Sequence, residues 1–219
     1  MSDVTFTGGN FGFCELMPSF LEYPGSDSQL DGGNQQFTAQ RLTFNGCKTA
    51  VQVIWDWGWV WKSITVTNAD VGFRLVNDDG SGNIGSASFM DSTFNNVKQA
   101  IVVAPISQNT GSGTTGIILD NVGFKSVGVG IADTTGKTLL SGASSVLNWV
   151  IGPVYNGTKR TWSSGQSLDQ LRELSLLGTL GGGLPNVPYF ERAKPQYESS
   201  GTGDFVHLKD LGCAGKTPS

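Results

Sequence analysis

The sequence predicts an all-β chain that folds as a parallel β-helix, in which short strands wind into coils that stack on one another. Residues 37–133 carry an internal repeat whose pattern is constant although its spacing is irregular. The composition, with 31 glycines and only 15% charged residues, suits short strands joined by tight turns and argues against a helical bundle or a disordered chain. The 219 residues are enough for one sizeable domain, or for one domain and a fragment.

The repeat places large and small residues at fixed positions. Each unit begins at a large apolar residue: Phe44, Val66, Phe94 and Phe124. Six and seven positions later a small residue precedes a large one: Ala50-Val51, Gly72-Phe73, Ala100-Ile101 and Gly130-Ile131. The units are 22, 28 and 30 residues apart, so a fixed core unit must carry loops of variable length. Such a unit buries its apolar face only by stacking on its neighbours.

Polar residues support the same stacking. Thr43, Thr65 and Thr93 occupy one outward position of successive units, where a β-helix would place them above one another. Turns at Asn45-Gly46, at Asn68 and at Asn95-Asn96 would join the two strands of each unit. A β-sandwich is the alternative fold, but it does not predict a recurring small residue before each large one.

The flanking segments lack this repeat. Residues 13–33 contain two prolines and several acidic residues and are interpreted as a loop or insertion. Residues 138–155 are expected to form one more coil, so that residues 1–162 make up a partial β-helix. Residues 163–204 are expected to be a non-repetitive linker, which includes a short helix or docking segment with leucines between 168 and 177. Phe205–Leu208 predicts a strand, and residues 205–219 are interpreted as the start of a truncated second β-helix.

Four tryptophans stand at alternate positions: Trp55, Trp57, Trp59 and Trp61. In an extended chain, alternate side chains leave by one face, so the four rings would form one flat apolar surface. Such a surface suits the C–H faces of a sugar ring. The alternative is that the rings pack inward as core.

If the second strands of successive coils stack, Gln52 and Arg74 become outward neighbours, with Val102 and Ala132 at the same level. The loops that follow carry the tryptophan run in one coil and Asn77–Ser81 in the next. Polar and aromatic side chains would then meet at one edge and form a saccharide subsite. The alternative is that Arg74 is a solvated surface charge and that Asp78-Asp79 only forms a turn.

Glycoside hydrolysis usually requires two carboxyl groups, and no motif marks one as the acid. The candidates are Asp56, Asp70, Asp78, Asp79 and Asp91. Asp56 lies between two tryptophans, where its pKa could be raised, but a structural Asp that binds turn amides is the favoured interpretation. His207 is the only histidine, so no catalytic triad or metal site can be built around it.

Charge and cysteine usage exclude several classes of function. The net charge of −4 and a pI near 4.9 argue against nucleic-acid binding. There is no apolar run of 18 residues that could cross a membrane. Cys14, Cys47 and Cys213 lack metal-type spacing and are interpreted as non-functional. Asn156-Gly157-Thr158 is a glycosylation sequon and is a weak indication of secretion.

Several stretches resemble a known family. The segments are residues 35–47, 51–61, 79–86 and 189–197. They are similar to the fungal exo-β-1,3-glucanases of glycoside hydrolase family 55, and the resemblance extends over residues 34–212.

The resemblance implies two tandem right-handed parallel β-helices of the pectate-lyase-like kind, with the cleft between them. Such enzymes release glucose from the non-reducing end of laminarin-type glucans with inversion, and their general acid is a Glu on the second helix. That acid would lie outside this chain, so we expect a fragment that contributes half of the cleft and is inactive alone. The partners expected are β-1,3-glucan and the second β-helix of the same protein, without a cofactor or metal. The family is secreted.

The resemblance also assigns roles to individual residues. Gln52 and Ser81 would position water or sugar, and Trp57 and Trp59 would stack on it, beside Arg74. Two alternatives remain: a non-catalytic saccharide-binding β-helix, and a polysaccharide lyase or tailspike-like β-helix. A lyase would need a Ca²⁺ site of clustered acids, for which only Arg74 with Asp78-Asp79 is suggestive.

Overall fold

The structure is a computed structural model. It describes residues 2–14, 36–53, 56–76, 85–105, 116–142, 145–169, 172–178, 187–191, 200–206 and 208–211. Two compact units are distinguished, residues 1–189 and residues 190–219, and each is described by itself. In the described part of the chain, no helix is long and apolar enough to cross a membrane.

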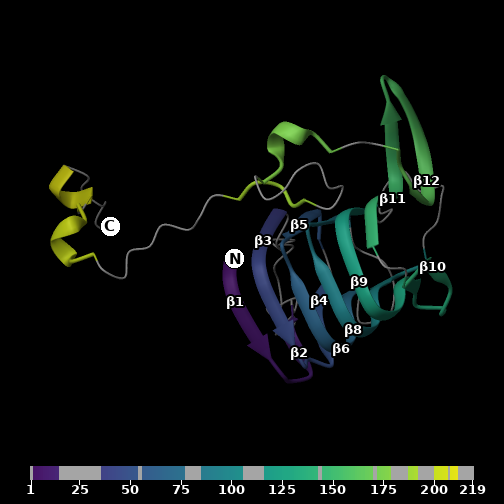
Figure 1. The fold of residues 1–219 in the computed structure, drawn as a ribbon, viewed down its shortest axis with the longest axis horizontal. Helices are drawn as coiled ribbons and strands as arrows, with labels where there is room; N and C mark the ends of the chain where they lie inside the picture. Colours follow the sequence, from purple (N-terminus) through teal and green to yellow (C-terminus); the bar gives the residue numbers. More distant parts are fainter. Residues whose placement is uncertain are drawn as a thin grey trace, which may run out of the picture. The chain divides into compact units, whose positions relative to one another are not determined.

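Nine parallel strands form the body of the first unit (Figure 1). They are β1 (Ser2–Thr7), β2 (Phe11–Cys14), β3 (Gln36–Asn45), β4 (Thr49–Val53), β5 (Gly58–Lys62), β6 (Thr65–Leu75), β7 (Ser86–Met90), β8 (Thr93–Val103) and β9 (Gly116–Asp133). Each coil pairs in parallel with the coil before and after it, which confirms the predicted parallel β-helix.

The pairings form three ladders along the stack. The first ladder joins the start of β3 to β5, β7 and the start of β9. The second ladder joins β1, the end of β3, and the starts of β6 and β8 to the middle of β9. The third ladder joins β2, β4, and the ends of β6, β8 and β9. Both alignments of large residues are confirmed, since Phe44–Val66–Phe94–Phe124 and Val51–Phe73–Ile101–Ile131 are in register.

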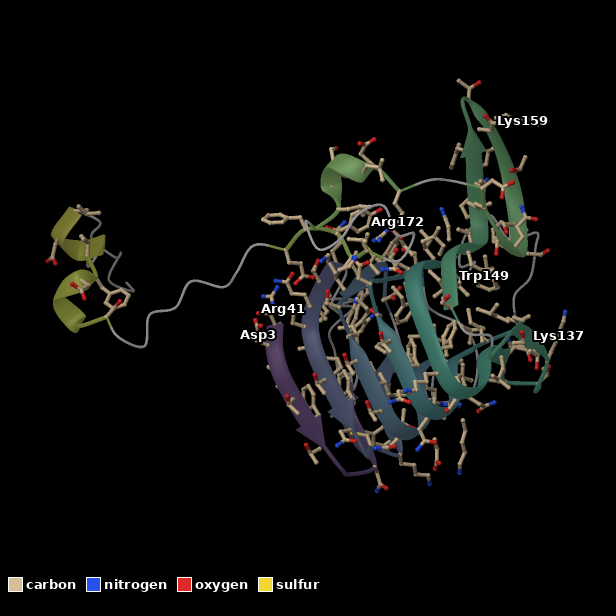
Figure 2. The ribbon with its side chains drawn as sticks, viewed as in Figure 1. Asp3, Arg41, Lys137, Trp149, Lys159 and Arg172 are labelled. Carbon is tan, nitrogen blue, oxygen red and sulfur yellow. The ribbon has the colours of Figure 1, made fainter. Side chains whose placement is uncertain are left out.

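Left-handed residues make the two corners of each coil. The corner between the second and third ladders has positive φ at Gly8, Gly46, Asn68, Asn96 and Ser126, which confirms the turns predicted at Gly46, Asn68 and Asn96. There the Asn96 side chain donates to Asn68 (2.7 Å), which donates to Asn45 (3.1 Å). The corner between the first and second ladders has positive φ at Asp3, Arg41, Ser63, Asp91 and Asn121. Arg41 and Asp3 form an ion pair of 2.7 Å at this corner (Figure 2).

The recurrent small residue has a steric cause. A Cβ on Gly72 would lie 2.5 Å from the backbone oxygen of Ala100 and 2.7 Å from the ring of Phe94. At Gly72 the backbone of one coil therefore lies so close to the next coil that a side chain has no room.

We expect Gly72→Ala to destabilise the fold by about 1–3 kcal/mol, because the clash is with backbone that the ladders hold in place. Gly116→Ala is the matched control, since the Cβ of that variant would meet its nearest atom at 3.5 Å, an ordinary contact. Its effect should stay within about 1 kcal/mol. Urea unfolding of the two variants measures the difference, and equal midpoints would contradict the steric explanation.

The strands β1 and β2 form one more coil, which precedes the predicted repeat. β1 and β2 repeat the pattern through Phe6 and the small-large pair Gly12-Phe13, and the Phe6 ring stacks on Phe44 at 4.8 Å. Phe13 and Cys14 thus belong to a strand paired with β4, so the loop predicted at 13–33 is wrong at its first two residues. Residues 15–33 lie outside the described residues.

The coil predicted at residues 138–155 is wrong. β10 (Thr138–Ser141) and β11 (Ser145–Asn156) both run antiparallel to β9. The chain reverses because the Asp133 carboxylate accepts from the backbone N–H groups of Thr135 (2.9 Å) and Lys137 (3.0 Å), which closes a tight turn. β12 (Lys159–Ser167) then forms a hairpin with β11.

After β12 a segment that we name the strap packs on the β-helix, and the structure describes its residues 168–169, 172–178 and 187–189. It contains the 3₁₀ helix η1 (Leu174–Leu176) and an isolated bridge between Leu177 and Tyr189. A docking segment was predicted from the leucines, but Leu174 and Leu176 are 75% and 57% exposed. The buried anchor is Arg172.

The second unit contains the 3₁₀ helices η2 (Thr202–Asp204) and η3 (Leu208–Leu211). The strand predicted at 205–208 is wrong, since Leu208 begins η3 and Phe205 and Val206 lie outside any strand. A strand needs a neighbour that accepts its backbone hydrogen bonds, and the described part of this unit provides none.

Candidate functional site

The predicted polar edge has the expected register. Gln52 pairs with Arg74, which pairs with Val102, which pairs with Ala132. Gln52 is only 6% exposed, and its amide nitrogen donates to the backbone oxygen of Val76 at 2.9 Å. Arg74 is half-buried. The two residues are therefore neighbours in the ladder as predicted, but Gln52 is buried and one of its amide donors is already used by the protein.

The tryptophan row divides between core and surface. Trp59 and Trp61 share the inward face of β5 and are each 1% exposed, and the Trp59 ring lies 4.6 Å from that of Phe37. Trp59 is thus wrong as a stacking candidate, because the inward face of the strand packs it into the core. Trp57 precedes β5 at a bend and is 64% exposed. Trp55 lies outside the described residues, as do Ser81 and Asp78-Asp79.

Asp56 has the structural role favoured from sequence. It is 3% exposed, and its Oδ1 accepts from the backbone N–H groups of Gly85 (2.8 Å) and Ser86 (3.1 Å). Asp56 therefore ties the loop of one coil to the first strand of the next. Cys47 is a free thiol in the core, and burial raises its pKa.

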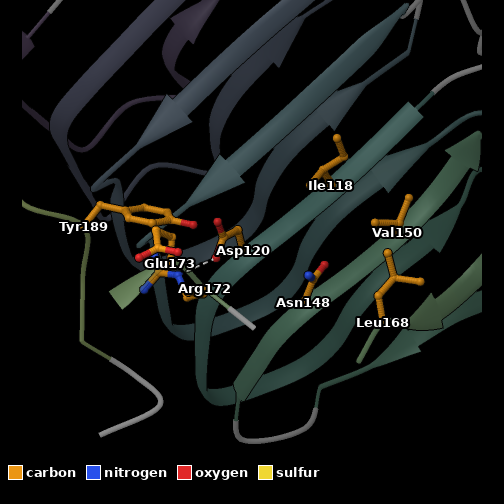
Figure 3. A pocket seen from close by; sticks show the side chains of 8 residues that line it. All are labelled: Ile118, Asp120, Asn148, Val150, Leu168, Arg172, Glu173 and Tyr189. Carbon is orange, nitrogen blue, oxygen red and sulfur yellow. Dashed lines mark ion pairs between the residues drawn. The ribbon is translucent and has the colours of Figure 1, made fainter. Parts of the chain in front are cut away.

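A pocket that the sequence did not reveal lies between the last strands of the stack and the strap (Figure 3). Its volume is about 360 Å³, and its lining residues are Ile118, Asp120, Asn148, Val150, Leu168, Arg172, Glu173 and Tyr189. The floor is the antiparallel pair β9–β11, where Ile118 faces Val150 and Asp120 faces Asn148. The strap supplies the walls.

A buried ion cluster fixes the strap over this floor. The Arg172 guanidinium lies 2.8 Å from Asp91 and 2.8 Å from Asp120, and its side chain is 5% exposed. It also donates to the backbone oxygen of Val187 and lies over the Tyr189 ring, 3.7 Å from the centroid. Asp91 in turn accepts from the Tyr189 backbone N–H at 2.9 Å and from the Asn121 side chain at 2.7 Å.

The two carboxyl groups at the pocket have opposite pKa shifts. Burial raises the pKa of Asp120, although the positive charge of Arg172 opposes the change. Hydrogen bonding by the backbone N–H of Ser175 lowers the pKa of Glu173. A pocket with two carboxyl groups, an amide and an apolar side can bind a polyhydroxylated ligand. Among the described residues, no group of three or more His, Cys, Asp or Glu is arranged to hold a metal ion.

The sequence signal for this pocket was weak. Asp91 was among the candidate carboxylates, but its partner Arg172 lies 81 residues further along the chain and outside the repeat. Asp120 pairs with Met90, which occupies the equivalent position in the preceding coil. The two residues differ in type, so the repeat does not identify Asp120 as a site residue.

Comparison with known proteins gives three kinds of relative. The family model for rhamnogalacturonase A/epimerase, pectate lyase-like, matches residues 1–74. The chain is 30% identical to the non-secreted LysM effector LysM15 of Penicillium expansum over 98% of this chain and 14% of that protein. It is 31% identical to a probable glucan endo-1,3-beta-glucosidase of Arthroderma benhamiae over 69% of this chain and 15% of that protein. It is 24% identical to a glucan 1,3-beta-glucosidase of Cochliobolus carbonum over 98% of this chain and 25% of that protein. The chain thus spans a quarter or less of each of these relatives.

Proposed function

This chain belongs with the pectate-lyase-like proteins related to fungal glucanases of the family 55 type, and from that premise we propose that it supplies half of a β-1,3-glucan-binding cleft. The two glucosidase-named relatives support a glucan hydrolase at family level. The observation that carries the proposal is the register of the third ladder, in which Gln52 of β4 is the neighbour of Arg74 of β6. The exposed Trp57 follows β4 in the sequence.

In this proposal Trp57 stacks on a glucosyl ring and Arg74 contacts its hydroxyl groups. Gln52 and Ser81 position water or sugar, and for Gln52 the free amide oxygen is the group available for this, since the nitrogen binds Val76. Hydrolysis is exo-acting and inverting, at the non-reducing end of laminarin-type glucan. The general acid is a Glu on a second β-helix of the same protein, outside this chain, and the protein acts outside the cell.

A binding module without catalysis is the second candidate. The observation that favours it is that LysM15, which aligns over 98% of this chain, is named an effector and not a hydrolase. Both candidates require saccharide binding at the third-ladder edge, and they differ in whether a second domain adds hydrolysis.

We expect the 219-residue chain to bind laminari-oligosaccharides with a change in tryptophan fluorescence, and to release no glucose from laminarin. Trp57→Ala should weaken binding about tenfold, or about 1.4 kcal/mol. Tyr155→Ala is the matched control, because Tyr155 is an aromatic with the same 64% exposure outside this edge. Glucose release by the chain alone would overturn the assignment of the acid to a second domain. Unchanged binding by the Trp57 variant would overturn the edge as the glucan site.

A further inference from the structure

The pocket between β9–β11 and the strap has a place of its own in the fold. Ile118 and Asp120 lie on the outward side of the first ladder, because their neighbours Ile117 and Leu119 are fully buried in the core. The predicted glucan edge lies on the third ladder, along β4 and β6. A ligand in the pocket would therefore lie on a different ladder from Gln52 and Arg74.

We propose that this pocket is a separate binding site for one unit of a neutral sugar. Its lining is divided in the way that a pyranose ring requires (Figure 3). Ile118, Val150 and Leu168 gather at one end, opposite the charged groups of the other end, and Asn148 lies between the two ends. Ile118 is 40% exposed, which leaves apolar surface available for the C–H face of a sugar. The volume of about 360 Å³ falls within the range of small-ligand pockets, about 300–1,000 Å³.

Asn148 provides the hydrogen-bonding capacity that hydroxyl groups need. Its side chain forms no hydrogen bond with another described residue, although it is half-buried and faces Asp120 across the strand pair. An amide offers two donors and one acceptor oxygen, and a half-buried amide gains from a ligand that uses them. Asp120 and Glu173 add carboxyl oxygens that accept from sugar hydroxyls.

The charge of the site selects a neutral ligand. Arg172 is the cation that lines the pocket, and Asp91 and Asp120 already bind its guanidinium. With Glu173 included, the acidic groups outnumber this cation by three to one. An anionic sugar such as a uronate would meet repulsion from Glu173 without a free cation to offset it. The buried ion cluster also holds the walls in place before a ligand arrives, which lowers the entropic cost of binding.

The test is a titration of the ¹⁵N-labelled full chain with glucose and with laminaribiose, in which the side-chain amide signals of Asn148 are followed. These signals are assigned by their loss in Asn148→Leu, a variant of similar shape. At about 50 mM sugar, a site with a Kd near 10 mM would be mostly occupied. We expect the signals to shift with either sugar, in the wild-type chain and in Trp57→Ala alike. The backbone amide signals of Asp120 and Val150, which line the same pocket, report binding where the Asn148 side chain is absent, and by them Asn148→Leu should weaken binding at least tenfold. Galacturonate should leave the signals unmoved.

The outcomes separate this proposal from the glucan edge. Absence of a shift with both neutral sugars would overturn the pocket proposal and leave the edge untouched. An equal shift with galacturonate would overturn the charge argument and the proposal with it. Loss of the pocket signal in Trp57→Ala would show one site and not two. If Asn148→Leu fails to fold, Ile118→Ser at an exposed position provides the second variant, with the same tenfold weakening expected.

Discussion

Replacement of Arg172 by methionine should destabilise the docked strap by about 3–5 kcal/mol. The guanidinium is 5% exposed and Asp91 is 2% exposed, so the substitution would leave two carboxylates near the core without a counter-charge. The bond to the Val187 oxygen and the contact with the Tyr189 ring would be lost as well. Limited proteolysis within residues 168–189, together with urea unfolding, measures the release of the strap and the loss of stability.

The control for Arg172→Met is Lys98→Met. Lys98 and Asp70 also form a close ion pair, of 2.7 Å, but their side chains are 78% and 46% exposed. Water solvates and screens such a pair, so its loss should cost less than about 1 kcal/mol. Similar losses of stability in the two variants would show that the buried Arg172 cluster stabilises the fold no more than an exposed ion pair does.

The pH dependence gives a further check on the Arg172 variant. Burial already raises the pKa of Asp120 in the folded chain, and Arg172 opposes that rise. Without Arg172 the folded-state pKa rises further above the unfolded value. A raised folded-state pKa favours folding below the unfolded pKa, and this contribution is lost as the pH rises through the folded pKa. The deficit of Arg172→Met should therefore shrink as the pH falls from 7 toward 4. A deficit that is constant over this range would contradict the account.

The stacking of the coils could be predicted because each coil repeats one pattern of side-chain sizes. Phe73 and Ile101 are in register because a small residue precedes each of them at the same distance from the start of its unit. The corner between the first and second ladders could not be predicted, because its residues have only a positive φ in common. Asp, Arg, Ser and Asn occupy it in different coils. A glycine in the sequence signals a left-handed φ, but Asp, Arg, Ser or Asn does so much less clearly.

The candidate site was predictable in part for a related reason. A period of two sets Trp59 and Trp61 on one face of a strand, but it does not say whether that face points inward. Gln52 and Arg74 follow from the repeat and are neighbours as predicted. The pocket does not follow from it, because the chain reverses after Asp133 and the strap returns to Asp91 from outside the repeat. When the segment that follows the last coil packs against the side of the β-helix, its contacts are not repeated from coil to coil, so the sequence shows no periodic pattern for them.

Phe73→Ala should cost about 3–5 kcal/mol of stability, the range for a large side chain removed from a tight core. Phe73 is fully buried and meets Trp61 and Phe89 edge to face, each with ring centroids 4.8 Å apart. Backbone ladders on both sides fix the coil spacing, so the neighbouring rings cannot close the cavity. Urea unfolding followed by tryptophan fluorescence measures the loss.

The control is Phe11→Ala, since Phe11 also lies on the third ladder but is 52% exposed, and its loss should cost less than about 1 kcal/mol. Because Phe73 directly precedes Arg74, the cavity should also loosen the predicted glucan edge while leaving the Asn148 pocket, on β9 and β11, intact. Oligosaccharide binding that depends on Trp57 should therefore weaken in Phe73→Ala before the chain unfolds. Equal stability of the two phenylalanine variants would mean that the aromatic core does not set the coil geometry on which that edge depends.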